Sequence, residues 1–500
     1  MLKLTNFKLD LEEKLDSSAI CRKLKLKPTE LLEWKILREA LDARRKDRLF
    51  WVYTLELKLK NEEKALAKNR NLSRVQPAEI IPLVPGLQRL RERPVIMGFG
   101  PAGIFAALLL AKEGYAPLVL EQGADLDTRV AQVEEFWQKG RLNPQSNVQF
   151  GEGGAGAFSD GKLTTLIKDP RCHWVLQELA AAGAPAEILY SSKPHIGTDN
   201  LRKVVKNLRQ KIQNWGGQIC FQKKITDINL TDSALTGIWI NGRKFKAAEV
   251  LIAALGHSAR DTFKMFYERG LKLEPKAFSV GLRLEHRQQT INLAQYQKFV
   301  GHSRLKAADY KLVYHSPSGR SAYTFCMCPG GQVVAAASES GHLVTNGMSY
   351  YARDGQNANS AVLVGVHPED FASGHPLAGV EFQRHWQRQA FLVGGENYQA
   401  PAQLVGDFLA GRPSTRGGAV EATYSRGVRW GDFGRCLPHY VLETLREALP
   451  VWDQQLQGFA DPQAVLTGVE TRSSSPVRIL RDSSGQASIR GIYPAGEGAG

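Results

Sequence analysis

The sequence lacks the features that mark several protein classes. No apolar run approaches the eighteen or so residues that a membrane-spanning helix needs. The first ten residues, MLKLTNFKLD, have no apolar signal core, so we expect a cytoplasmic location. Six cysteines scattered over 500 residues, with no CxxC pair, indicate neither a disulfide framework nor a zinc site, and we expect no metal. No Ser-His-Asp set, HExxH motif or P-loop is apparent.

Positive charge is in excess and unevenly placed. Lys and Arg number 65 against 50 Asp and Glu, a formal net charge of +15. Residues 1–93 hold 22 of these cations and 14 of the acids, so the excess there is +8. A basic segment can attract nucleic acid. In ALDARRKDR (40–48), however, both signs alternate, and we favour a solvated helix face over a nucleic-acid site.

The stretch from Pro94 to Gly123 is the most informative part of the chain. An apolar run leads into Gly98-x-Gly100-x-x-Gly103, and an Ala- and Leu-rich helical segment, a second apolar run and Glu121 follow. This order predicts strand, tight turn, helix and strand, which is a dinucleotide-binding unit. The helix N-terminus offers free N–H groups to phosphates. An acid about twenty residues beyond the turn accepts from the ribose hydroxyls and disfavours NADP.

The first 93 residues predict a small α/β domain and a linker. Residues 2–9 and 49–59 alternate as strands, while 11–48 carry helical spacing, so we expect a β-α-α-β domain over 1–60. Residues 61–93, polar and then proline-bearing at Pro77, Pro82, Pro85 and further on, predict a linker.

Beyond Gly123 the chain predicts the rest of the dinucleotide-binding domain and an inserted domain. We expect a helix from Thr198 to Gly217, a strand at 218–221, a meander up to Lys246 and a buried parallel strand at 250–256. Over 276–465, strands of a mostly antiparallel layer and helices around 380–410 and 437–449 predict a cap domain. The last segment, SIRGIYPAGEGAG, returns to a strand followed by glycines.

This order of elements resembles flavoproteins of the two-dinucleotide-fold class. More closely, the chain resembles a bacterial family of uncharacterised FAD-dependent dehydrogenases. The matching strings include SNVQFGEGGAGAFSDGKLTT, ALGHSARDTF, YTFCMCPGG, TNGMSYYARDG, APAQLVGDFL, LTGVETRSSSPVR and YPAGEGAG. The resemblance implies a Rossmann-like FAD-binding domain in two parts, 94–275 and 466–500, with a mixed or antiparallel β cap at 276–465 between them. In that family a glycine-led helix follows Gly-Glu-Gly, so the end at Gly500 suggests a fragment or a truncated form.

The resemblance also implies which residues hold FAD. Gly98, Gly100, Pro101, Ala102 and Gly103 would cradle the pyrophosphate, and Glu121 would bind the adenosine ribose. Arg129 would reach the phosphates, with a surface arginine as the equal alternative. Ile225 would present backbone to the adenine. Gly256 is the retained glycine of the Ala-x-Gly strand motif. Gly496 and Glu497 would lie near the ribityl chain, although Glu497 can equally be a helix N-terminal acid.

A glycine loop at 150–162 is our choice for the flavin ring, because bare backbone can approach a flat ring closely. Its Gly151, Gly153 and Gly156 match GxGxxG, but no strand precedes it and no apolar helix follows, so we reject it as a second dinucleotide fold. Lys162 would stabilise anionic reduced flavin, with surface solvation as an equal alternative. The residues expected to face the flavin are Gly153, Gly154, Ala155, Gly156 and Ser159.

Four further residues are candidates for catalysis. Cys326 and Cys328, two apart on a strand, lie about 6.7 Å apart between Cα atoms, the outer limit for a disulfide. We favour a buried inert pair over a redox pair. His257 faces the flavin or substrate, or is structural. Arg472, with the serines and Arg478 after it, binds an anionic substrate or anchors a loop near the FAD.

These expectations combine into an FAD-dependent oxidoreductase that transfers hydride between flavin and a small substrate, which can be anionic. NAD(P)H would dock briefly at the flavin, without a Rossmann unit of its own. One alternative is a flavoprotein that associates with RNA through the basic N-terminal domain, although interleaved exposed aromatics are missing. Another is an inactive truncated homologue that serves as a scaffold. We expect no membrane partner and do not favour nucleic acid.

Overall fold

The computed structural model describes residues 1–76, 84, 86, 89–165 and 167–500. The chain forms two compact units. The first contains residues 1–85, 162–196 and 292–308, and the second contains 86–161, 197–291 and 309–500. The predicted linker prolines Pro77, Pro82 and Pro85 lie outside the described residues. In the described part, no helix combines the length and the apolar character needed to cross a bilayer.

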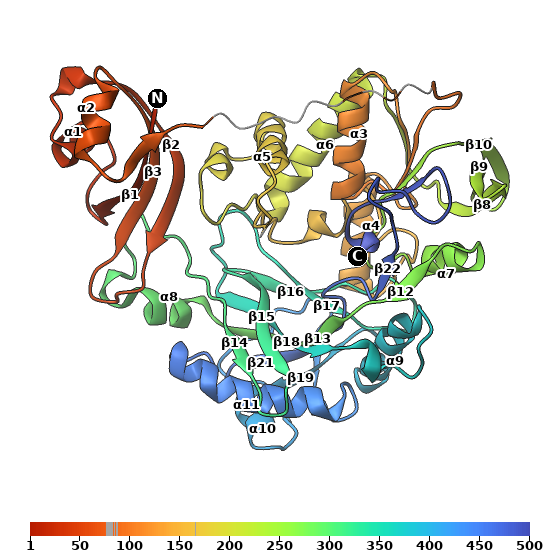
Figure 1. The fold of residues 1–500 in the computed structure, drawn as a ribbon. Coiled ribbons are helices and arrows are strands. Elements are labelled where there is room, and N and C mark those ends of the chain that lie inside the picture. Colours follow the sequence, from red (N-terminus) through yellow and green to blue (C-terminus); the bar gives the residue numbers. More distant parts are fainter. Residues whose placement is uncertain (77–83, 85, 87–88, 166) are drawn as a thin grey trace. The chain divides into compact units, whose positions relative to one another are not determined.

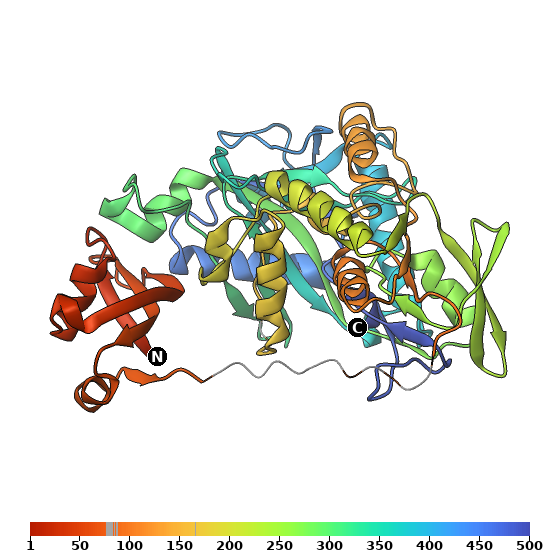
Figure 2. The same cartoon turned by 90° about the horizontal axis from the view of Figure 1, so that it is seen from above.

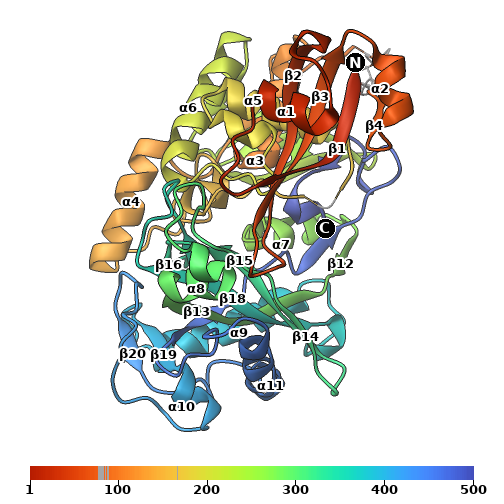
Figure 3. The ribbon, with the colours of Figure 1, turned by 90° about the vertical axis from the view of Figure 1, so that its left-hand side faces the viewer.

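The first unit is built on a four-stranded sheet in the order β2-β3-β1-β4. Its elements follow one another as β1 (Leu2–Asp10), α1 (Ser17–Leu24), β2 (Leu31–Asp42), β3 (Phe50–Leu59), α2 (Glu62–Lys68) and β4 (Leu72–Arg74). Figures 1 and 3 show α1 and α2 beside this sheet. The core lies between helices and sheet, and alternate β1 and β3 side chains such as Leu4 and Leu55 are buried there. This β-α-β-β-α-β order is that of the ferredoxin-like motif.

The structure corrects two expectations for this region. The helical spacing over 11–48 does not produce a long helix, because α1 ends at Leu24 and residues 31–42 pair with β3 as a strand. Pairing along the whole of β3 outweighs a helical preference that is weak in any case. The expected linker at 61–93 contains α2 and β4, and β4 pairs with β1.

The second unit contains a five-stranded parallel sheet in the order β23-β11-β5-β6-β7. Its strands are β5 (Val95–Met97), β6 (Leu118–Leu120), β7 (Gln218–Cys220), β11 (Leu251–Ala253) and β23 (Ile492–Pro494). Successive strands are added on one side of β5 up to β7 and then on the other side. This is the order of a doubly wound sheet, which binds ligands at the carboxyl ends of its strands where the winding reverses. That point lies between β5 and β11.

Helices and a small meander complete this part of the unit. Helix α3 (Pro101–Lys112) joins β5 to β6, and α6 (Thr198–Asn214) precedes β7. Both views in Figures 1 and 2 show α3 and α6 side by side. The predicted meander is confirmed as an antiparallel sheet in the order β10-β9-β8. Its strands are β8 (Ile225–Thr231), β9 (Ala234–Ile240) and β10 (Lys244–Ala247).

A seven-stranded sheet, in the order β14-β15-β18-β13-β21-β19-β20, is the largest sheet described in the unit, which also contains the two-stranded sheets β12-β22 and β16-β17. All its neighbouring strands are antiparallel except β19 and β20. Helix α11 (His439–Gln455) packs against β13, β15 and β18 (Figure 1). The strands are β13 (Phe278–Arg287), β14 (Val313–His315), β15 (Ser321–Cys328), β18 (Asn357–Val366), β19 (Ala400–Leu404), β20 (Val428–Trp430) and β21 (Val465–Glu470).

Two details differ from the expected cap. The helical region predicted around 380–410 is interrupted by β19, so that α9 (Ala378–Val393) and α10 (Val405–Leu409) are separate helices. The predicted boundary at 465 falls at the start of β21, which belongs to this sheet. The remaining elements of the second unit are α4 (Leu126–Lys139), α7 (Arg260–Glu268), β12 (Leu273–Pro275), β16 (Gln332–Ala335), β17 (Thr345–Met348) and β22 (Val477–Ile479). Helix α5 (Arg171–Ala181) belongs to the first unit, and α8 (Gln288–Tyr296) begins in the second unit and ends in the first.

A buried carboxyl in the middle of the seven-stranded sheet leads to a prediction about pH. Burial raises the pKa of Glu285 from 4.5 to about 7, against the opposing effect of hydrogen bonds from Thr423 and Asn357. The folded protein therefore holds this proton more tightly than the unfolded chain does. The contribution of the protonated Glu285 carboxyl to the free energy of unfolding is fully present below pH 4.5 and is lost as pH rises through about 7.

We expect Glu285→Gln to remove this loss. Between pH 4.5 and 8, the wild-type free energy of unfolding should fall relative to that of the variant by about 3 kcal/mol. Urea unfolding at several pH values measures the difference. The buried Glu470, whose pKa burial also raises to about 7, is unchanged in both proteins and serves as the internal control. Parallel pH profiles for the two proteins would contradict this assignment.

Candidate functional site

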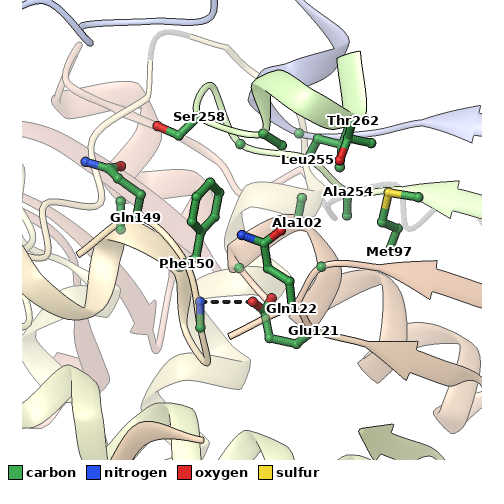
Figure 4. A pocket seen from close by; sticks show the side chains of 18 of the residues that line it. Met97, Ala102, Glu121, Gln122, Gln149, Phe150, Ala254, Leu255, Ser258 and Thr262 are labelled. Carbon is green, nitrogen blue, oxygen red and sulfur yellow. Dashed lines mark hydrogen bonds between the residues drawn. The ribbon is translucent and has the colours of Figure 1, made fainter. Parts of the chain in front are cut away.

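A cavity of about 320 Å³ lies within the second unit, at the carboxyl ends of β5, β6, β11 and β23. This is the size of a small-molecule site and the place where a doubly wound sheet binds its ligand. In Figure 4, Ser258 and Gln149 lie toward one end of the cavity, and Met97 and Thr262 lie toward the other. The predicted residues that line it are Gly98, Gly100, Pro101, Ala102, Glu121, Gly154, Ala155, Gly156, Ile225, Gly256, His257, Gly496 and Glu497.

The turn after β5 has the geometry that its glycines predict. Gly98 has φ of +98°, a left-handed conformation that favours glycine. A Cβ on Gly103 would lie 2.0 Å from the carbonyl oxygen of Gly98, so this position needs a residue without a side chain. Helix α3 begins at Pro101, and its first-turn N–H groups have no acceptor within the helix. The cavity therefore has an electropositive, uncapped helix end at its wall.

The carboxylate of Glu121 is already engaged by backbone. Its Oε1 accepts from the N–H groups of Gly123 (2.8 Å) and Gly151 (2.9 Å), and its Oε2 accepts from Phe99 (2.8 Å). In Figure 4 a dashed line marks one of the hydrogen bonds that the Glu121 carboxylate accepts. A carboxylate offers about four acceptor positions, so within the described residues one position, on Oε2, has no donor. Glu121 can accept one ribose hydroxyl in this arrangement, rather than both as the sequence suggested.

Arg129 differs from both of its expected roles. It is fully buried, does not line the cavity and does not lie on the surface. Its guanidinium instead donates to five backbone carbonyls in the glycine loop and just before it: Asn147 (2.8 Å), Val148 (2.9 Å), Gly151 (3.3 Å), Glu152 (2.6 Å) and Gly154 (2.9 Å). Burial lowers the pKa of this guanidinium to about 9. Arg129 thus fixes the loop that carries Gly154, Ala155 and Gly156 to the cavity wall.

Three other predicted residues lie close to the cavity-lining segments without lining the cavity. Gly103 packs α3 against the turn after β5, as described above. Gly153 donates its N–H to the Phe99 carbonyl at 2.9 Å and so connects the glycine loop to the turn after β5. The Ser159 hydroxyl donates to the Gly156 carbonyl at 3.0 Å and accepts from the N–H of Gly161. These contacts are structural and hold the loop in place.

His257 and Arg472 are linked through a serine that the sequence did not single out. The Ser258 hydroxyl lies 2.7 Å from Nδ1 of His257 and accepts from Nη1 of Arg472 at 2.9 Å. Burial lowers the pKa of His257, and the effect of Glu497 opposes this shift. Burial and the neighbouring Arg260 lower the pKa of Arg472 well below its usual range. Ser258 and His257 line the cavity, and Arg472 lies directly behind Ser258.

The remaining catalytic candidates lie elsewhere. Lys162 belongs to the first unit, where it forms an antiparallel bridge with His195. Cys326 and Cys328 form no disulfide within the described residues and lie at an irregular place in β15, where the register with β18 shifts, and Cys328 is fully buried. Neither cysteine is among the residues that line the cavity. Their catalytic roles stay predictions.

Several cavity residues were missed from the sequence. Gln149 immediately precedes the glycine loop, Phe150 is its first residue, and Gln122 follows Glu121, so their nearness to predicted residues was the available signal. Lys223 adds positive charge to the wall near Ile225. Thr262 reaches the cavity from the first turn of α7. A side chain facing the site from a helix has no local pattern of its own.

Comparisons with known proteins give both family and fold similarities. Residues 277–473 match the family described as FAD-dependent protein, C-terminal domain-like, and residues 1–58 match a domain of unknown function. The predicted resemblance to FAD-dependent proteins is thus confirmed over the C-terminal region.

Similarity to solved structures is weak. The structure of CtdE in complex with FAD is 13% identical, with 81% of this chain and 77% of that chain covered and a TM-score of 0.29. The halogenase PltM is 12% identical, covers 56% and 52% of the two chains and has a TM-score of 0.30. The flavin-dependent brominase Bmp2 is 12% identical, covers 54% and 55%, and has a TM-score of 0.29. These scores are too low to carry an argument about this chain.

A full-length relative is much closer. A protein of Clostridium beijerinckii, described as uncharacterised, is 48% identical over 505 residues, which cover all of this chain and 95% of the relative. Identity at this level along the whole length shows that the chain belongs to the same family as this clostridial protein.

Proposed function

We propose that the protein is an FAD-dependent oxidoreductase that transfers hydride between the flavin and a small substrate. The observation that supports this best is the cavity where the winding of the parallel sheet reverses, lined by the Gly98-x-Gly100 turn, the N-terminus of α3 and Glu121. The match of residues 277–473 to an FAD-dependent family supports it independently.

The residues at the cavity fit a dinucleotide. The backbone of Gly98 and Gly100 and the first turn of α3 would hold the pyrophosphate, and Oε2 of Glu121 would accept one ribose hydroxyl. Ile225 would contact the adenine, and Gly154 to Gly156 would contact the flavin ring. When bound, FAD supplies the hydride chemistry itself. The chain's part is to bind the cofactor, exclude water and orient the substrate.

NAD(P)H as a transient electron donor is part of the same proposal. The second GxGxxG match, Gly151 to Gly156, leads into a short 3-10 helix at Gly154–Phe158, with no β-α-β unit around it. A nicotinamide donor would therefore approach the flavin directly, without a dinucleotide fold of its own.

We expect the purified chain to bind FAD at one equivalent and to show the two visible absorption bands of oxidised flavin. If the protein is purified without cofactor, titration with FAD and with FMN separates the contribution of the adenosine half. FAD should bind at least tenfold more tightly than FMN, because FMN lacks the groups that Glu121 and Ile225 would contact. Equal affinity for the two flavins, or no flavin binding, would contradict the proposal.

A further inference from the structure

A cluster of arginines lies behind the Ser258 end of the cavity, in the same unit. We call Arg260, Arg384, Arg472 and the carboxylate of Glu339 the arginine cluster. Glu339 accepts from Nη1 of Arg260 at 2.6 Å and from Nε and Nη2 of Arg384 at 3.1 and 2.7 Å. The Arg260 side chain is 1% exposed, whereas those of Glu339 and Arg384 are 26% and 34% exposed.

Arg472 has no anionic partner in the described part of the chain. Its guanidinium donates to the hydroxyls of Ser258 and Ser338 and to the amide oxygen of Gln387. The same amide oxygen also accepts from Nη1 of Arg260 at 3.2 Å. Arg260 pairs with Glu339, and Arg384 pairs with both Glu339 and Glu381, so Arg472 is the member that faces a neutral amide instead of a carboxylate. Leaving a buried cation without a counter-charge costs several kcal/mol, so the imbalance calls for an anion.

Unsatisfied hydrogen-bond donors in the arginine cluster are a second indication that the cluster lacks a further anion. The Nε atoms of both Arg260 and Arg472 are buried and have no hydrogen-bond partner among the described residues. Such groups are rare in folded proteins, and each calls for an explanation. Loop anchoring explains the bonds of Arg472 to serine, but it does not explain a surplus of buried positive charge.

The directions of two hydrogen bonds show how Arg472 is linked to the cavity through Ser258 and His257. Arginine only donates, so the Ser258 hydroxyl accepts from Arg472 and keeps one proton to give. Donating that proton to Nδ1 of His257, 2.7 Å away, satisfies all three groups. The proton of a neutral His257 then lies on Nε2, which has no partner among the described residues. The imidazole therefore presents a fixed N–H donor from the cavity wall.

We propose that the His257–Ser258 end of the cavity binds an anionic group of the substrate, a carboxylate or a phosphate. In this arrangement the Nε2–H of His257 donates to the anion, Ser258 holds the imidazole in place, and the arginine cluster supplies the positive field behind them. Arg472 is a positioning residue that acts through Ser258. This inference rests on the proposed function for the identity of the ligand as substrate, and it assigns that substrate's chemical class.

The experiment measures saturable binding of small anions to the flavin-loaded protein at constant ionic strength. Acetate and phosphate are the probes, acetamide is the neutral control, and the readouts are the melting temperature and the flavin absorbance. We expect a saturable rise in melting temperature with acetate or phosphate but not with acetamide. Whichever of the two binds more tightly identifies the anion as carboxylate or phosphate.

The variant Gln387→Glu tests the charge argument with little change in shape. A carboxylate at this position would give Arg472 an internal counter-charge, so we expect a higher melting temperature without ligand and an anion Kd raised at least tenfold. Gln210→Glu, which adds the same charge on the exposed face of α6, should leave both unchanged. Ser258→Ala should also raise the anion Kd, because it breaks the link from Arg472 to His257.

Two results would overturn the proposal: anion effects no larger than those of chloride, or equal anion affinity in wild type and Gln387→Glu. The flavin content of the purified protein distinguishes failure of the anion site from failure of the proposed function. A protein that binds flavin but no anion refutes only the anion site. A protein that binds no flavin refutes the oxidoreductase, and it keeps the anion site only if Gln387→Glu weakens the saturable anion binding, because an empty diphosphate turn at Gly98 and Gly100 would bind anions without responding to that substitution.

Discussion

Arg129→Met is expected to destabilise the second unit by about 3–5 kcal/mol and to weaken FAD binding at least tenfold. The substitution removes the donors to five carbonyl oxygens of the segment 147–154. An unsatisfied buried carbonyl costs about 1–3 kcal/mol, although local relaxation keeps the total below the sum of five such costs. Urea unfolding measures the stability, and flavin fluorescence measures the affinity.

The loop explains why binding and stability change together. The segment that Arg129 holds continues into Gly154, Ala155 and Gly156, which form part of the cavity wall. Arg129→Lys keeps the charge but offers fewer donors and no planar fork, so it should recover less than half of the loss. A recovery as complete as wild type would show that charge, rather than the set of five bonds, holds the loop.

Arg202→Met is the matched control. The guanidinium groups of Arg129 and Arg202 each lie 4.8 Å from the Phe158 ring, so both variants lose a similar cation–π contact. Arg202 donates a long hydrogen bond of 3.5 Å to the Ala157 carbonyl. We expect Arg202→Met to lower the free energy of unfolding by about 1 kcal/mol or less. If the two variants lose similar stability, the carbonyl bonds of Arg129 are not the cause.

How far the sequence predicted this structure depends on the range of the interactions. Gly98, Gly103 and Glu121 act within one strand-turn-helix-strand unit, where spacing along the chain determines geometry, and their placement followed from the motif. The parallel strand at 250–256 was likewise readable from its apolar run. Residues 31–42 show the limit, because pairing with β3, a partner that their own pattern does not reveal, decides their conformation.

The site shows the same division. Arg129 binds backbone carbonyls, which any residue supplies, so no side-chain pattern could reveal its partners. The link from Arg472 to Ser258 joins residues 214 positions apart, and Gln387 reaches them from α9. Charge balance in the arginine cluster appears only when these segments are brought together, which is why the sequence left Arg472 with two equal roles.

Glycine substitutions at the turn between β5 and α3 are expected to distinguish effects on the stability of the fold from effects on FAD binding. In Gly103→Ala the new Cβ would lie 2.0 Å from the Gly98 carbonyl oxygen and 3.0 Å from its carbon. Backbone atoms cannot rotate away as a side chain can, so α3 must move off the turn. We expect a loss of about 3 kcal/mol in the free energy of unfolding, together with loss of FAD binding.

Gly100→Ala should behave differently. Its added Cβ would meet only the Gly154 Cα, at an ordinary 3.6 Å, so the free energy of unfolding should change by less than about 1 kcal/mol. Gly100 lines the cavity at the start of α3, where backbone must approach the diphosphate closely. The FAD Kd should therefore rise at least tenfold, about 1.4 kcal/mol, in a protein that unfolds like wild type.

Gly256→Ala is the control for this pair, because Gly256 lines the same cavity and its added Cβ has no neighbour within 4 Å. It should keep the stability of wild type and lose less FAD affinity than Gly100→Ala does. If Gly100→Ala binds FAD as wild type does, the diphosphate does not lie on the turn between β5 and α3. The cavity would then hold a different ligand, since the close backbone approach at Gly100 is what a dinucleotide specifically requires.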